Sequence, residues 1–247
     1  MDDLTGAERL ARRSRAVTLL ALATLTLLAW AWLLQGAGMG TGAMRMDWDA
    51  SRFLLVAAMW WVMMIAMMLP SAAPLILLYG RVHRHSGDPP PTAPFLAGYL
   101  AVWLGFALLA ASLQSLLEQR GFVSMATMAL PNGWLAAGIL IAAGLYQLTS
   151  LKDACLASCR TPSDFLTRHY RPGAKGAWRM GLTHGAYCVG CCWLLMALLF
   201  VGGVMNLAWI AALTLLVAAE KSLPGGPWIA RISGVLFILW GAAILLV

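Results

Sequence analysis

Two sulfur-rich stretches stand inside apolar runs of this sequence. The first carries closely spaced methionines, and the second carries a histidine followed by three cysteines. Their members are Met59, Met63, Met64, Met67 and Met68 in the first stretch, and His184, Cys188, Cys191 and Cys192 in the second. Polar or metal-capable groups inside lipid are energetically costly and usually functional. Because thiolate and thioether ligands together select soft ions, the pairing indicates Cu(I).

The composition is that of a membrane protein. Only 11% of the residues are charged and 61% are hydrophobic, whereas a soluble domain has roughly 25% and 45–50%. Several uncharged stretches reach the roughly 20 residues that are needed to cross a bilayer. The net charge of +7 therefore bears on topology. The lipid bilayer is the expected partner, and nucleic acid is not.

The apolar runs predict an all-α fold, a polytopic membrane helix bundle with about seven transmembrane helices. The expected spans are residues 16–35, 53–79, 95–117, 133–151, 182–201, 204–219 and 229–246. Residues 1–15 are expected to form a cytoplasmic N-terminal tail, and residues 16–247 a single transmembrane domain. The first apolar stretch is longer than the roughly 7–15 residues of a signal peptide, which indicates an uncleaved anchor helix.

Two regions of these spans contain helix breakers. Pro70 and Pro74 each remove a backbone donor and are expected to kink the span 53–79. Residues 182–219 would make a single helix of roughly 57 Å at 1.5 Å per residue. That length is too great for a hydrocarbon core of about 30 Å. The dipeptide Gly202-Gly203 therefore predicts a turn between two helices.

Positively charged residues predict the orientation. When the N-terminus is placed in the cytoplasm, 14 of the 17 Lys and Arg residues fall in inside segments and 3 fall outside. Lys and Arg concentrate in cytoplasmic loops of membrane proteins. The sequence thus predicts a multi-pass protein of a bacterial inner membrane, with its N-terminus in the cytoplasm and its C-terminus outside.

The second sulfur-rich stretch presents its ligands on one helical face. His184, Cys188 and Cys191 lie at i, i+4 and i+7, and Cys192 lies on the flank of that face. At 1.5 Å per residue, Met68 and the last two cysteines lie at a similar depth, roughly 14–16 Å above the inner surface. The thiols and thioethers are therefore expected to meet near mid-membrane if their helices touch.

A second pair of thiols, Cys155 and Cys159, follows the span that ends at residue 151. Their i, i+4 spacing places both on one face if the helix continues. Inert reduced cysteines are the alternative in a cytoplasmic setting, and methionine is also a common gap-filler in apolar cores. Glu220 and Lys221 are expected to form an ion pair at a helix end.

Three motifs resemble a bacterial family described as predicted metal-binding integral membrane proteins. They are Trp60-Trp61-Val-Met63-Met64-Ile-Ala-Met67-Met68-Leu-Pro70 with Pro74, Lys152-Asp-Ala-Cys155-Leu-Ala-Ser-Cys159-Arg160-Thr-Pro162, and His184-Gly-Ala-Tyr187-Cys188-Val-Gly190-Cys191-Cys192-Trp193. The resemblance covers about residues 55–225. It implies a helical fold with several spans and a soft metal, without an established reaction or substrate.

The leading hypothesis is a protein that binds a soft metal, with Cu(I) as the expected ion, and transports or delivers it. In this interpretation Cys188, Cys191 and Cys192 are thiolate ligands, and Met67 and Met68 complete the sulfur site, with Met63 and Met64 one turn away. His184 relays the ion toward the inner face, and Cys155 and Cys159 exchange it with cytoplasmic thiols. A copper chaperone or a copper enzyme under assembly is the expected protein partner.

Two other functions stay open. The Cys188-x-x-Cys191 spacing is also a redox signature, so a transmembrane thiol–disulfide protein is the first alternative. A metal-dependent membrane enzyme is the second, although the sequence contains no HExxH, GxSxG or Walker loop, and no catalytic residue is assigned. Zinc is possible for cysteine and histidine ligands, but methionine ligands argue against it.

Overall fold

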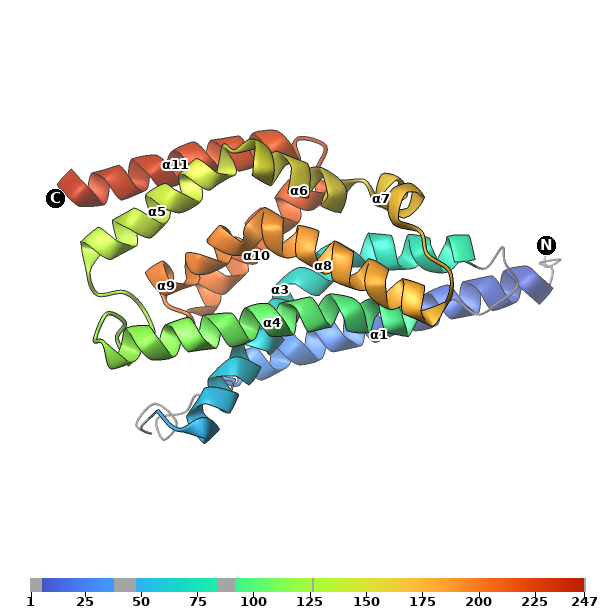
Figure 1. The fold of residues 1–247 in the computed structure, drawn as a ribbon, viewed down its shortest axis with the longest axis horizontal. Coiled ribbons are helices and arrows are strands. Elements are labelled where there is room, and N and C mark those ends of the chain that lie inside the picture. The colour runs from blue at the N-terminus through green and yellow to red at the C-terminus, as the bar shows by residue number, and fades with distance from the viewer. Residues whose placement is uncertain (1–5, 38–47, 84–91, 126, 247) are drawn as a thin grey trace.

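The structure, a computed structural model, describes residues 6–37, 48–83, 92–125 and 127–246. In these residues the secondary structure is helical, without a strand, so the predicted all-α fold is confirmed. The helices are α1 (Gly6–Leu34), α3 (Ala50–His83), α4 (Thr92–Gln119), α5 (Gly133–Gln147), α6 (Ser150–Arg160), α7 (Pro162–His169), α8 (Gly173–Ala197), α9 (Leu199–Gly202), α10 (Leu207–Ser222) and α11 (Gly226–Leu246). Most run along the long axis of an elongated bundle (Figure 1).

Five helical segments of the described chain are long and apolar enough to cross a membrane. They are Arg15–Leu34, Ala50–Val82, Thr92–Gln119, Gly173–Gly202 and Gly226–Leu246. The pair α5 and α6 also qualifies if it is taken as one span, although it bends by 66°. The segment expected at 204–219 forms α10, which has 16 residues and falls short of these lengths. Five segments, or six with the bent pair, are thus consistent with a membrane protein.

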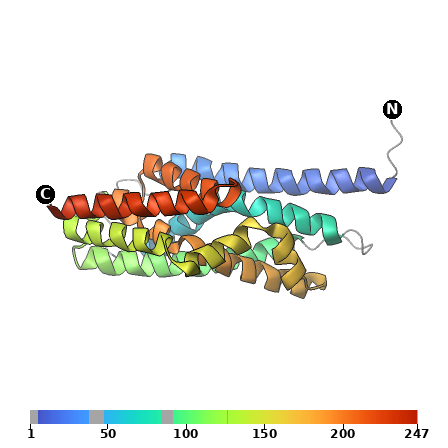
Figure 2. The same ribbon diagram turned by 90° about the horizontal axis from the view of Figure 1, so that it is seen from above.

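The helices that carry the sulfur-rich stretches lie in the interior of the bundle. The most apolar windows of α3 and α8 are 56% and 50% buried, whereas those of α1 and α11 are only 17% and 28% buried. Helix α4 packs along α8, α5 along α11, and α1 along α3. Figure 2 shows α1 and α4 at opposite sides of the bundle. The helices that bear the candidate ligands are therefore more buried than α1 and α11.

Glycines allow α4 and α8 to approach closely. A Cβ atom at Gly98 of α4 would overlap the backbone carbonyl oxygen of Trp178, and one at Gly181 of α8 would overlap that of Phe95. Small residues at such crossings let helix backbones come together in membranes. This contact sets the position of α8 relative to α4, and with it the position of the α8 cysteines.

The turn after α9 confirms the break predicted at Gly202-Gly203. Gly203 has a φ of 93°, a left-handed conformation that glycine adopts without a Cβ clash. The side chain of Asn206 accepts a hydrogen bond from the backbone N–H of Trp209 and so caps α10. The chain therefore reverses here, and α10 returns into the bundle beside α3 and α6.

A buried polar network fastens the first half of α3 to the end of α4. Arg52 donates to Glu118 at 2.6 Å, and Gln114 donates to the other carboxylate oxygen at 2.8 Å. The indole N–H groups of Trp48 and Trp60 donate to Glu118 and Gln114. Buried charges are tolerated when they are paired and hydrogen-bonded. The network thus fixes how α3 sits against α4.

Candidate metal centre

The three cysteines of α8 are buried together. Cys188, Cys191 and Cys192 are each 1% exposed. The thiols of Cys191 and Cys192 donate to the backbone carbonyl of Cys188, at 3.1 and 2.9 Å. All described cysteines are free of disulfides. The i, i+3 and i+4 spacing therefore gathers three reduced thiols within one turn of an interior helix.

A thioether from another helix reaches this turn. The thiol of Cys192 lies 3.8 Å from the sulfur of Met68 on α3. Met68 is fully buried, and its backbone carbonyl accepts a hydrogen bond from Tyr99 of α4. The structure thus brings Met68 and Cys192, which are 124 positions apart, into sulfur–sulfur contact. Met63, Met64 and Met67 are also buried in the core.

A fourth thiol arrives from α6. The buried thiol of Cys159 lies close enough to the thiols of Cys188 and Cys191 to interact with them electrostatically. Cys155, one turn earlier, is partly exposed, and a Cβ atom at Gly190 would lie 2.9 Å from its sulfur. Cys159 is therefore a member of the buried cluster, and Cys155 stands at its edge against the backbone of α8.

The cluster contains a lysine ammonium group. The Nζ atom of Lys221 on α10 lies 3.0 Å from the sulfur of Cys188, 3.7 Å from that of Met68, and 3.4 Å from the hydroxyl of Ser71. The ion pairs in the described part of the chain join Arg52 to Glu118, Lys152 to Glu220 and Arg231 to Asp153. None of these carboxylates pairs with Lys221. Its positive charge is thus directed at sulfur.

The expected ion pair between Glu220 and Lys221 is therefore wrong. Consecutive helical residues point about 100° apart, so the two side chains leave α10 in different directions. Glu220 pairs instead with Lys152 of α6 at 2.6 Å and accepts a hydrogen bond from Gln147 of α5 at 2.6 Å. This buried pair connects α6 to α10 and holds Cys159 against the α8 thiols.

Tyr99 and His184 pack beside the thiol cluster, next to Cys188. The hydroxyl of Tyr99 lies 3.2 Å from the sulfur of Cys188, and its ring stacks on that of His184 with centroids 5.7 Å apart. His184 is 2% exposed. Its Nδ1 atom has no hydrogen-bond partner among the described residues. A buried nitrogen left without a partner is costly, and it is available for a ligand.

Three residues of this cluster were not predicted from the sequence. The role of Lys221 could have been found from the sequence, because a charged residue next to an apolar run needs a partner. The roles of Tyr99 and Ser71 could not, because their participation depends on how α4 and α3 are rotated against α8.

The donor atoms present suit a soft monovalent ion better than a hard one. In the described part of the chain, no three His, Cys, Asp or Glu side chains are arranged around one point as they would surround a bound metal. The cluster instead mixes thiols with the thioether of Met68. Thioether and thiolate sulfur select Cu(I), whereas structural zinc is held by four cysteine or histidine ligands.

Comparison with known proteins gives one result. The chain matches the family PpoB2, described as a copper chaperone, over residues 57–244. No curated protein and no solved structure matches it. The matched range includes α4 to α10 whole, most of α3 and α11, and all of the sulfur residues described above. The match supports a copper-related role for the protein, and the chain belongs to the PpoB2 copper chaperone family.

Proposed function

We propose that the protein holds a Cu(I) ion inside its helix bundle and delivers it to a partner. The ion would lie between the α8 thiols, Cys159 and Met68. The observation that carries the proposal is the contact between Cys192 and Met68, which gathers thiol and thioether donors from different helices at a buried point. Cu(I) is satisfied by few soft ligands, so a subset of these sulfur atoms is sufficient.

Charge balance supports a monovalent ion. A Cu(I) ion with two thiolates carries a net charge of −1, and an unpaired charge in an apolar interior is costly. The ammonium group of Lys221, 3.0 Å from Cys188, offsets that charge. Without copper, the same ammonium would pair with one thiolate. The buried cluster would then be neutral in both states, and loading would exchange one thiol proton for one Cu(I).

A stepwise path leads from the edge of the cluster to its centre. Cys155 is partly exposed and lies against Gly190, one helical turn from the buried Cys159. An incoming ion would bind Cys155 first and then exchange one sulfur ligand at a time. The predicted orientation places α6 toward the cytoplasm. The first described turn of α1 and the last turn of α11 lie at opposite ends of the bundle (Figure 1), in keeping with termini on opposite sides of a membrane.

Replacing Met68 with leucine tests this proposal. The variant Met68→Leu preserves volume and apolar character, and it removes the sulfur that contacts Cys192. We expect the affinity for Cu(I), measured by competition with a Cu(I) chelator in detergent, to fall by at least roughly tenfold, the lower end for loss of an outer-shell metal partner. Met59→Leu is the matched control, because Met59 is equally buried on the same helix.

Equal Cu(I) affinities for the Met68→Leu and Met59→Leu variants would overturn the placement of the ion. A thiol–disulfide redox protein would give a different result with the same two variants. A redox protein would retain its disulfide exchange in both variants, because the exchanging atoms are the cysteine sulfurs and the thioether takes no part.

A further inference from the structure

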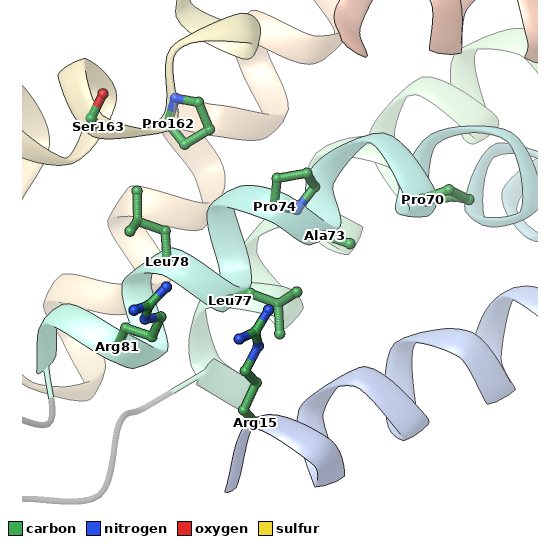
Figure 3. A pocket seen from close by; sticks show the side chains of 9 residues that line it. All are labelled: Arg15, Pro70, Ala73, Pro74, Leu77, Leu78, Arg81, Pro162 and Ser163. Carbon is green, nitrogen blue, oxygen red and sulfur yellow. The ribbon is translucent and has the colours of Figure 1, made fainter. Parts of the chain in front are cut away.

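A pocket of about 540 Å³ opens on α3 away from the sulfur cluster. Its wall comes from Pro70, Ala73, Pro74, Leu77 and Leu78 of α3. Arg15 of α1 and Arg81 of α3 contribute its cations, and Pro162 and Ser163 of α7 complete it. Figure 3 shows the guanidinium groups of Arg15 and Arg81 beside the two leucines, with the start of α7 across the pocket. The pocket thus combines an apolar wall with two positive charges.

The positive charges of this pocket lack acidic partners in the described chain. Neither Arg15 nor Arg81 belongs to one of the ion pairs of the described residues. The Thr161 side chain makes no capping hydrogen bond at the N-terminus of α7, where helix N–H groups favour an anion. The carboxylate in the first turn of α7, that of Asp164, contacts the hydroxyl of Ser163. Two guanidinium groups and a helix start therefore face one space.

The position of the charges matches the boundary of an apolar layer. Arg15 begins the apolar segment Arg15–Leu34, and Arg81 stands next to the last residue of the segment Ala50–Val82. Both therefore lie where a phospholipid headgroup begins. From Arg81 the apolar wall extends back along α3 to Pro70, roughly 16 Å at 1.5 Å per residue. This distance accommodates much of an acyl chain.

We infer that this pocket binds an anionic phospholipid. The headgroup phosphate pairs with Arg15 and Arg81, since guanidinium forms strong charge-assisted hydrogen bonds to phosphate. The acyl chain lies along Ala73, Pro74 and Leu77. The two arginines come from different helices, so the bound lipid links α1 to α3 at this end of the bundle. The site is separate from the sulfur cluster and does not depend on the metal.

Native mass spectrometry of the purified full chain tests this site with phosphatidylglycerol and phosphatidylcholine as probes. Each basic residue near a membrane surface strengthens the binding of anionic lipids. Two arginines are therefore expected to favour phosphatidylglycerol over phosphatidylcholine by roughly 30-fold. The double variant Arg15→Gln/Arg81→Gln is expected to lose that preference. Arg179→Gln, which changes an exposed arginine of α8 outside the pocket, is expected to keep it.

Two further measurements separate a loss of lipid binding from a loss of fold and a lipid from free phosphate. Circular dichroism and gel filtration in detergent establish that the double variant retains its helices, and its phosphatidylcholine binding is expected to match that of the unchanged protein. Inorganic phosphate at millimolar concentration is expected to leave phosphatidylglycerol bound. Equal binding of the two lipids by the unchanged protein, an unaltered preference in the double variant, or displacement by inorganic phosphate would each overturn the assignment.

Discussion

Replacing Cys188 with serine is expected to lower the affinity for Cu(I) by more than about 100-fold, beyond the roughly 10–100-fold that loss of an outer-shell partner costs. Cys188 is the most connected thiol of the cluster. Its sulfur contacts the ammonium group of Lys221 at 3.0 Å and the hydroxyl of Tyr99 at 3.2 Å, and it lies close enough to the thiol of Cys159 for an electrostatic interaction. A serine hydroxyl is a hard donor and does not replace a thiolate for a soft ion.

The control for this variant is Cys155→Ser. Cys155 is partly exposed at the edge of the cluster, so its loss is expected to slow loading and to leave the equilibrium affinity within about twofold, a change well below the cost of an outer-shell partner. Both affinities are measured by chelator competition under reducing conditions. Equal affinities for the two variants would show that the buried thiol is not a ligand.

Replacing Lys221 with glutamine is expected to weaken Cu(I) binding by roughly 10–100-fold, as for other partners that tune a metal site without ligating it. The variant removes the positive charge that offsets the thiolates and keeps a polar side chain of similar length. A buried anionic copper–thiolate group then has no counter-charge, and an unpaired buried charge is strongly unfavourable. The glutamine leaves the sulfur donors in place, so the loss measures the charge.

Lys175→Gln is the matched control for Lys221, because Lys175 is exposed near the start of α8. Its affinity is expected to equal that of the unchanged protein. The Lys221→Gln protein is also compared without copper by thermal unfolding in detergent, which separates a loss of fold from a loss of binding. If a folded Lys221→Gln protein binds Cu(I) as tightly as Lys175→Gln, then the ammonium group has no role in holding the ion.

Much of the cluster could be predicted from the spacing of its residues along a helix. Residues at i, i+3 and i+4 share a face, which placed Cys188, Cys191 and Cys192 together. The rise of 1.5 Å per residue placed Met68 at their depth, and the structure brings Met68 to Cys192. The same geometry separates Glu220 from Lys221 and would have corrected the expected ion pair between them.

Other parts of the cluster depend on tertiary structure. Cys159 reaches the α8 thiols because the chain bends by 66° between α5 and α6, and the Thr149 side chain starts α6 by accepting a hydrogen bond from the N–H of Lys152. The apolar run predicted a span that ends at residue 151, and it left open whether the helix continues to Cys155 and Cys159. The role of Tyr99 depends on the close packing of α4 against α8, which glycines permit.

The number of membrane spans also could not be predicted from the sequence alone. Long apolar runs predicted α1, α3, α4, α8 and α11 as helices, and these are the segments that reach membrane-spanning length. The run at 204–219 is apolar but short, and its helix ends at Ser222, with Lys221 directed into the sulfur cluster. Hydropathy reports burial away from water. It does not distinguish burial in lipid from burial inside a bundle.

X-ray absorption at the copper edge, on Cu(I)-loaded protein with selenomethionine in place of methionine, identifies the atoms that bind the ion. The cysteines keep their sulfur, so thiolate and thioether neighbours become distinguishable. We expect copper bound by sulfur together with a copper–selenium contribution that persists in Met59→Leu and disappears in Met68→Leu. A copper ion with no selenium neighbour in the unchanged protein, or one bound only by nitrogen and oxygen, would contradict this expectation.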